Sequence, residues 1–215
     1  MPLPAVPGLG PSPFLYPLID THVCAARKHD PVALAQAYLA GGARLLQLRC
    51  KGPSSGAFLD LADRLVAVTG AAGATLVIND RADIARLSSA GGVHVGQEDL
   101  SVPDARAVVG VRTIVGVSTH DELQIDAALE TTATYIAVGP VFGTTTKDTG
   151  YTARGLHLVR YASSRGKPVV AIGGVTLERA PSLVEAGATG LAVITDLLAE
   201  ADVEGRTRRF IQAIS

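Results

Sequence analysis

Short apolar runs and helix-length segments alternate eight times along the chain, and this regularity constrains the fold more than any other feature. The apolar runs cover residues 14–19, 45–48, 76–78, 93–95, 113–117, 135–138, 169–172 and 191–194. The segments between them predict helices over residues 31–40, 54–68, 82–88, a short one from 102, 121–130, 156–164, 176–186 and 203–214. Strands that are each followed by a helix pair in parallel, and eight such units predict an α/β fold, a (β/α)8 TIM barrel in a single domain. An open, doubly wound sheet is the alternative.

Composition agrees with a large buried core and excludes some partners. The chain has 215 residues, of which 47% are hydrophobic and 18% charged, and it has no Trp. The formal net charge of −1 predicts that neither nucleic acid nor an anionic membrane is a partner. Anion binding would therefore depend on a local group of cations.

The cysteines and the N-terminal segment indicate the cellular compartment of the protein. Cys24 and Cys50 lie in unrelated segments without metal-ligand spacing, which predicts free thiols in a cytoplasmic protein. No apolar stretch reaches the roughly twenty residues that span a bilayer. Residues 1–13 are rich in proline and lack the pattern of a signal peptide. We expect them to form a flexible or loosely docked tail before a catalytic barrel over residues 14–215.

Polar side chains follow almost every apolar run, at the barrel end where such folds build active sites. After the second run, Gln47, Arg49 and Lys51 share one side of an extended strand. Arginine offers a forked donor for phosphate oxygens and lysine a point charge. These residues predict an anion site, although a solvated basic turn has the same composition.

Acidic and further polar residues follow the next runs. Asp80 and Asp99 end the third and fourth runs, where two carboxylates can share one Mg²⁺ ion whose other ligands are water and phosphate. A simple helix cap is the alternative for Asp80. Ser118 and Lys147 add donors after the fifth and sixth runs. We assign His94 a structural role and His120 a role in orienting its loop or capping a helix.

The ends of the last two runs, Gly173-Gly174 and Thr195, predict a second anion site. In many barrels these positions hold a phosphate group through backbone N–H groups, and glycine allows close approach. The mouth would then hold a metal-assisted diphosphate opposite a phosphate monoester. Such a site suits a reaction in which pyrophosphate leaves and a second, phosphate-bearing substrate supplies the nucleophile.

Six ordered motifs resemble those of the thiamine phosphate synthase family. They are Gln-Leu-Arg-x-Lys at 47–51, Ile-Asn-Asp at 78–80, His-x-Gly-Gln-x-Asp-Leu at 94–100, Gly-x-Ser-Thr-His at 116–120, Gly-Pro-x-Phe-x-Thr-x-Thr-Lys at 139–147, and Ile-Gly-Gly at 172–174. The resemblance covers nearly the whole chain after about residue 16. It implies a transferase that joins hydroxymethylpyrimidine diphosphate to hydroxyethylthiazole phosphate and releases pyrophosphate. A dissociative path through a pyrimidinylmethyl cation is also implied.

The resemblance implies roles for particular residues. The diphosphate would contact Arg49, Lys51, Asn79, Ser118 and Lys147, of which all but Asn79 are assigned as catalytic. Mg²⁺ would be held by Asp80 and Asp99, and the aminopyrimidine by Gln47. The thiazole phosphate would contact Thr144, Thr146, Gly174, Ile194 and Thr195. The partners are then small-molecule substrates, and a homodimer is compatible with the sequence.

Departures and rival functions complete the hypothesis. Gly143 stands where the family commonly has proline, Thr195 where serine is usual, and residues 151–154 are less typical. A related thiazole tautomerase would use His120 to move a proton, but it has no need of two aspartates beside three cations. A catalytically silent barrel that binds a thiamine precursor would have lost a metal-binding aspartate or Lys147, and both are present.

Overall fold

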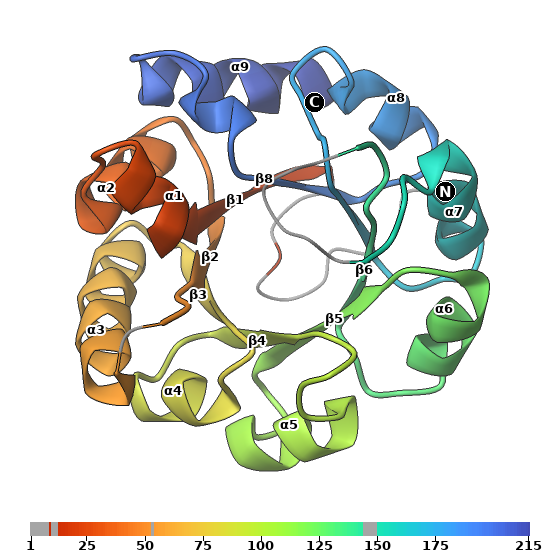
Figure 1. The fold of residues 1–215 in the computed structure, drawn as a ribbon, viewed down its shortest axis with the longest axis horizontal. Helices are drawn as coiled ribbons and strands as arrows, with labels where there is room; N and C mark the ends of the chain where they lie inside the picture. The colour runs from red at the N-terminus through yellow and green to blue at the C-terminus, as the bar shows by residue number, and fades with distance from the viewer. Residues whose placement is uncertain (1–8, 10–12, 53, 144–149) are drawn as a thin grey trace.

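The computed structural model describes residues 9, 13–52, 54–143 and 150–215. Its strands are β1 (Phe14–Asp20), β2 (Leu45–Arg49), β3 (Thr75–Asn79), β4 (Gly92–Val95), β5 (Ile114–Thr119), β6 (Tyr135–Val138), β7 (Val169–Ile172) and β8 (Gly190–Val193). Each pairs in parallel with the next, and β8 pairs with β1 to close the ring (Figure 1). The predicted (β/α)8 TIM barrel is therefore confirmed, and the open sheet is excluded.

Helices surround the barrel on its outside (Figure 1). They are α1 (Thr21–Ala26), α2 (Pro31–Ala40), α3 (Ser55–Ala71), α4 (Ala82–Leu87), α5 (Val102–Val109), α6 (Glu122–Leu129), α7 (Gly155–Ser163), α8 (Ala180–Glu185) and α9 (Val203–Ile214), with a short 3₁₀ helix η1 (Asp196–Leu198). None of the helices in the described ranges is long and apolar enough to cross a membrane.

Two apolar cores hold the elements together. The larger one lies between strands and helices and includes Leu46, Ile78 and Phe210, all fully buried. The smaller one joins inward-facing side chains such as Val77 and Val170 within the barrel. Burial on both faces explains why most strand positions are apolar, without a regular alternation of apolar and polar residues.

Several element bounds differ from the predictions. The sequence did not predict α1, which starts because the Asp20 carboxylate accepts hydrogen bonds from two backbone N–H groups of its first turn. Strand β5 extends to Thr119, so Ser118 belongs to the strand and does not follow it. Helix α8 starts at Ala180 and not at residue 176. The start of α1 depends on a local cap, whereas the end of β5 depends on pairing with β6, which is distant in sequence.

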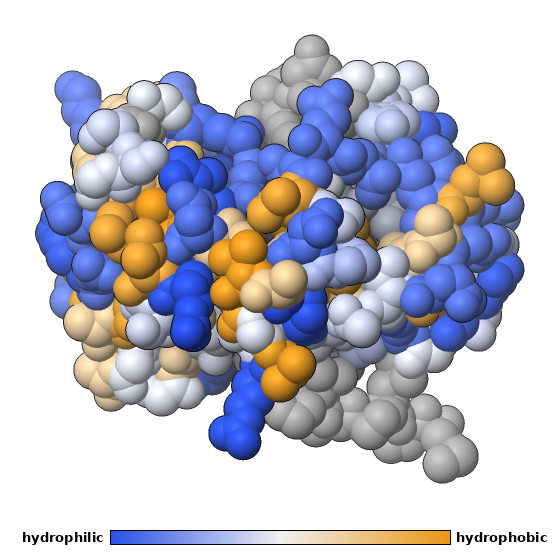
Figure 2. All heavy atoms as spheres, turned by 90° about the horizontal axis from the view of Figure 1, so that it is seen from below, coloured by the Kyte–Doolittle hydropathy of each residue, from blue (hydrophilic) through white to orange (hydrophobic). Residues whose placement is uncertain are grey.

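The described surface carries few large apolar side chains. Leu87, Val111 and Leu123 are the most exposed of them, at 66%, 87% and 82%. In Figure 2, hydrophobic groups on the face seen from below are separated by hydrophilic side chains. Leu9 is different, because it is 2% exposed and packs with the core inside the barrel. The other residues of the predicted tail, apart from Pro13, lie outside the described part of the chain, so the tail remains a prediction.

Candidate active site

A cavity lies at the C-terminal ends of the strands, and all eight strands contribute to its lining. It holds about 940 Å³ of empty space that is partly open to solvent. The predicted site residues that line it are Gln47, Arg49, Asn79, Ser118, Gly174, Ile194 and Thr195. Lys51, Asp80 and Asp99 are not part of the lining. Thr144, Thr146 and Lys147 lie outside the described residues.

The first two strands place an acid opposite a base at the cavity wall. Strand pairing aligns Asp20 of β1 with Arg49 of β2, and a guanidinium nitrogen of Arg49 lies 2.5 Å from Asp20 Oδ2. Both side chains are shielded, with exposed fractions of 2% for Asp20 and 16% for Arg49. The Nε of Arg49 is buried and has no hydrogen-bond partner among the described residues. The guanidinium therefore keeps unused donor capacity at the cavity wall.

The ends of β3 and β4 bring together the two predicted metal-binding aspartates. The side chains of Asp80 and Asp99 are neighbours, and Lys51 forms an ion pair with Asp80. Asp99 also accepts a hydrogen bond of 2.7 Å from the backbone N–H of Gly96. Burial, together with the neighbouring Asp80, raises the pKa of Asp99 above its usual range. The two neighbouring carboxylates repel each other when both are ionised, and a cation bound between them would offset that repulsion.

Backbone geometry also directs Asp80 toward this position. Its φ of 66° lies in the left-handed region, and its N–H donates to the carbonyl of His94 at 2.7 Å. Such conformations cost energy and concentrate at functional sites. Within the described ranges, no group of three or more His, Cys, Asp or Glu side chains could hold a metal ion. A pair of carboxylates suits Mg²⁺, which keeps water and substrate phosphate as its other ligands.

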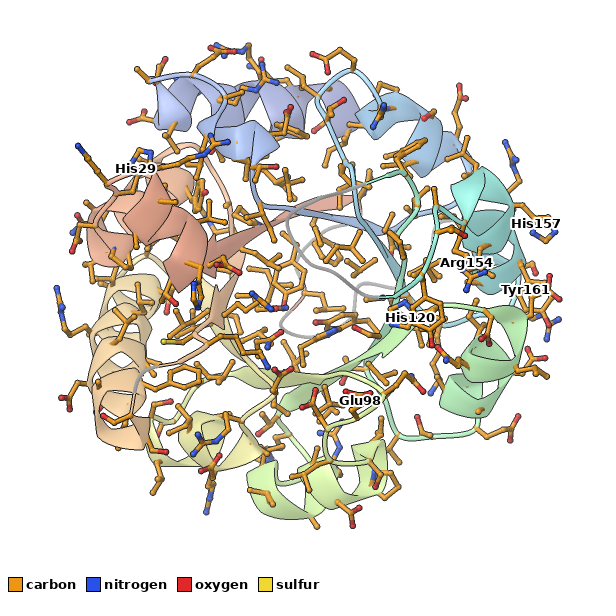
Figure 3. The ribbon with its side chains drawn as sticks, in the orientation of Figure 1. His29, Glu98, His120, Arg154, His157 and Tyr161 are labelled. Carbon is orange, nitrogen blue, oxygen red and sulfur yellow. The ribbon has the colours of Figure 1, made fainter. Side chains whose placement is uncertain are left out.

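Two histidines line the cavity, and the structure agrees with the modest roles predicted for them. His94 uses both ring nitrogens, with Nδ1 2.9 Å from the Tyr135 hydroxyl and Nε2 2.9 Å from Ser118 Oγ. His120 Nδ1 lies 2.5 Å from the carbonyl oxygen of Gly139, and its ring stacks on Tyr151 with centroids 4.2 Å apart. In Figure 3, His120 lies on the inner side of the helix ring, whereas His157 lies at the periphery.

The predicted second anion site lies at the ends of β7 and β8, where Gly174, Ile194 and Thr195 line the cavity. Gly174 has a φ of 61°, and a Cβ at this position would lie 2.6 Å from the carbonyl oxygen of Gly143 and 2.8 Å from Phe142 Cβ. Glycine is therefore required here because the loop after β6 packs against it. That packing brings the loops of β6 and β7 together at one side of the mouth.

Three polar residues that face the cavity or the barrel interior were not predicted from the sequence: Asp20, Tyr16 and Tyr135. Asp20 follows the first apolar run, so the rule applied to the other strand ends would have found it. Tyr16 and Tyr135 lie within apolar runs, and their hydroxyls lie 3.1 Å apart. Their position inside the barrel depends on strand register, which the sequence does not reveal.

Comparisons with known proteins agree on one family. A family model described as thiamine monophosphate synthase matches residues 15–197. The thiamine-phosphate synthase of Roseiflexus castenholzii is 38% identical over 96% of this chain and 89% of its own length. The synthase of Anaeromyxobacter dehalogenans is 42% identical over 84% and 81%. Among solved structures, the thiamine phosphate pyrophosphorylase of Pyrococcus furiosus has a TM-score of 0.84 at 27% identity, covering 94% of this chain and 95% of that one.

Proposed function

This chain belongs to the thiamine monophosphate synthase family and is a transferase that forms thiamine phosphate, and we propose which residues at the barrel mouth carry that reaction. The substrates are hydroxymethylpyrimidine diphosphate and hydroxyethylthiazole phosphate, and pyrophosphate is released. One observation carries the assignment: the neighbouring carboxylates of Asp80 and Asp99, with Lys51 paired to Asp80, follow β3 and β4, whose residues Asn79 and His94 line the cavity together with Arg49. This combination of acids and bases suits a metal-bound diphosphate.

The diphosphate is assigned to the side of the mouth formed by β2, β3 and β5. Arg49, Asn79 and Ser118 line the cavity there and supply a guanidinium, an amide and a hydroxyl. Lys51 would exchange part of its interaction with Asp80 for a phosphate oxygen. Lys147 belongs to the same proposed set and lies outside the described residues. Donors fixed around a leaving group stabilise the charge that develops on it, and they need not reorganise during the reaction.

Mg²⁺ is assigned to Asp80 and Asp99, whose four carboxylate oxygens match the preference of this ion for oxygen ligands. When bound, the ion would neutralise charge on the departing diphosphate. Lys51 holds the carboxylate of Asp80 in place, and the backbone N–H of Gly96 holds the carboxylate of Asp99. The residues present therefore fit the ion.

Gln47 is assigned to the aminopyrimidine, and Gly174, Ile194 and Thr195 to the thiazole phosphate across the cavity. We propose a dissociative path, in which pyrophosphate leaves and the thiazole nitrogen captures the pyrimidinylmethyl cation. The cavity shows no activated nucleophile among its described residues. The side chains would thus act by placing the two substrates and stabilising the leaving group.

The tautomerase alternative requires His120 to carry a proton. Its Nδ1 lies at the carbonyl of Gly139, its backbone N–H donates to Gln124 Oε1, and its ring stacks on Tyr151. These contacts suit an orienting residue between the loops after β5 and β6.

Cytoplasmic location and a homodimer remain predictions for this chain.

The metal assignment is tested by replacing Asp99 with Asn and measuring pyrophosphate release at saturating Mg²⁺. We expect the rate to fall by at least about a hundredfold, because roughly 3 kcal/mol of leaving-group stabilisation is lost. Asp83→Asn is the matched control, since Asp83 is an exposed acid whose described ion pair is with Arg81. Binding of Mn²⁺, followed by its electron spin resonance signal, should weaken in Asp99→Asn only. An unchanged rate and unchanged Mn²⁺ binding in Asp99→Asn would remove Asp99 from the metal site.

A further inference from the structure

Five polar side chains form a continuous hydrogen-bonded chain across the inside of the barrel. Gln47 Nε2 donates to the Tyr16 hydroxyl at 2.9 Å, and the Tyr16 and Tyr135 hydroxyls lie 3.1 Å apart. The Tyr135 hydroxyl lies 2.9 Å from His94 Nδ1, and His94 Nε2 lies 2.9 Å from Ser118 Oγ. We call these five residues the interior chain. Its two ends are the side chains assigned to the pyrimidine ring and to the diphosphate.

The interior chain is shielded from water over most of its length. The exposed fractions are 1% for Tyr16, 0% for Tyr135, 3% for Gln47 and 7% for His94. Burial raises the pKa of both phenols above the usual range for tyrosine, so each hydroxyl keeps its proton at neutral pH. Buried polar groups are costly when unpaired, and this cost favours an arrangement in which each hydrogen has an acceptor.

With the Gln47 amide nitrogen facing Tyr16, as it does in the structure, the chain has one consistent direction. The amide nitrogen of Gln47 can only donate, so the Tyr16 oxygen accepts and Tyr16 gives its hydrogen to Tyr135. Tyr135 then donates to His94 Nδ1. A neutral histidine that accepts at Nδ1 carries its proton on Nε2, which donates to Ser118 Oγ. The chain therefore leaves the carbonyl oxygen of Gln47 as an acceptor at one end and the hydrogen of Ser118 as a donor at the other.

We infer that Tyr16, Tyr135 and His94 are positioning residues that fix the hydrogen-bonding direction of Gln47 and Ser118. The chain makes the Gln47 end selective for a ring that bears an exocyclic amino group, because an amine donates to the Gln47 oxygen. It makes the Ser118 end selective for an anionic oxygen, which accepts the serine hydrogen. This inference rests on the roles proposed above for Gln47 and Ser118.

The amino-selective end is tested with Tyr16→Phe and two substrates. One is the aminopyrimidine diphosphate, and the other is its analogue with a ring carbonyl in place of the amino group. Without the Tyr16 oxygen, the Gln47 amide can turn and offer its N–H groups to that carbonyl. We expect the ratio of kcat/KM for the amino substrate over the oxo analogue to fall at least about tenfold from the wild-type value.

The donor end is tested with Tyr135→Phe, which removes the group that makes Nδ1 of His94 an acceptor. The serine hydrogen is then no longer directed into the cavity. We expect the inhibition constant of inorganic pyrophosphate to rise at least about threefold. Both variants keep the aromatic ring, and circular dichroism together with a thermal melt establishes that they are folded.

Tyr38→Phe is the matched control for both variants. Tyr38 is also 0% exposed, but it lies on α2, and its hydroxyl has no hydrogen-bond partner among the described residues. We expect its substrate ratio and pyrophosphate inhibition to equal those of the wild type. A Tyr16→Phe enzyme that loses rate on both substrates equally would overturn the inference and leave the proposed function intact. A wild type that accepts both rings equally would overturn the proposed role of Gln47 as well.

Discussion

Asp20 and Asp30 cap consecutive helices in the same way, yet only Asp20 lies at the cavity. In each residue, Oδ1 accepts hydrogen bonds from the two N–H groups found two and three positions later. The remaining oxygen of Asp20 binds Arg49, whereas Asp30 is exposed to solvent. One carboxylate thus starts helix α1 and also orients a cation assigned to the diphosphate. Asp30 serves as an internal reference for the capping role alone.

We predict that Asp20→Asn lowers kcat/KM for the pyrimidine diphosphate about tenfold, equivalent to roughly 1.4 kcal/mol. Asparagine caps helices as well as aspartate does, so the variant should stay folded while Arg49 loses its ionic partner. Steady-state kinetics with Asp30→Asn as the control would isolate this effect. A rise in kcat/KM for Asp20→Asn would mean that Asp20 competes with the substrate for Arg49.

The packing between the neighbouring strands β5 and β6 requires a glycine on one strand opposite a tyrosine on the other. Strand pairing places Gly116 opposite Tyr135, and a Cβ on Gly116 would lie 2.1 Å from Tyr135 Cζ. A side chain at residue 116 would therefore displace the ring that occupies the middle of the interior chain. Register between the two strands, and not the conformation of either one, makes this glycine necessary.

We predict that Gly116→Ala lowers the free energy of unfolding by about 2 kcal/mol, because an overpacked interior must shift. Urea denaturation should show a lower midpoint with an unchanged slope. Gly70→Ala provides the comparison, since a Cβ there would meet nothing within 4 Å and the residue lies in α3. This control should be neutral or more stable by up to about 1 kcal/mol. Equal midpoints for the two variants would contradict the steric argument.

At the scale of the whole barrel, a group of ion pairs joins the loops after β7 and β8 to the final helix, α9. Arg206 of α9 lies 2.7 Å from both Asp196 and Glu200, and its side chain is 10% exposed. Asp196 also accepts a hydrogen bond of 3.1 Å from the backbone N–H of Leu177, in the loop after β7. One acid therefore connects the loops after β7 and β8, which carry the proposed thiazole phosphate site, to the final helix.

We predict that Arg206→Ala lowers the free energy of unfolding by about 3 kcal/mol, because the shielded carboxylate of Asp196 loses its counter-charge. The same helix supplies a control, since Arg208 forms an exposed i,i+4 pair with Glu204. Arg208→Ala should cost less than about 0.5 kcal/mol. Chemical denaturation of both variants measures the difference. Similar losses would show that Arg206 acts as a surface residue.

Much of the architecture is readable in the sequence because it depends on local patterns. Strand β6 has the predicted bounds, Tyr135–Val138, and strand β7 has the bounds predicted for residues 169–172. Both of these strands are continuous apolar runs, as expected in a sheet that is buried on both faces. The end of β5 was misplaced by two residues, because its last pairing is with β6 and not with nearby residues.

The active site likewise has features that local sequence predicts and features that depend on the assembled barrel. Residue order alone placed Gln47, Arg49, Asn79 and Ser118 at strand ends, and parallel pairing brings all strand ends to one mouth. Which side chains meet there depends on register and closure, which are properties of the assembled barrel. No local segment predicts the pairing of Asp20 with Arg49. The same is true of the contact between Tyr16 and Tyr135, which lie 119 positions apart. The sequence therefore predicted which chemical groups lie at the mouth of the barrel. The direction of the hydrogen bonds between them could be read only from the tertiary structure.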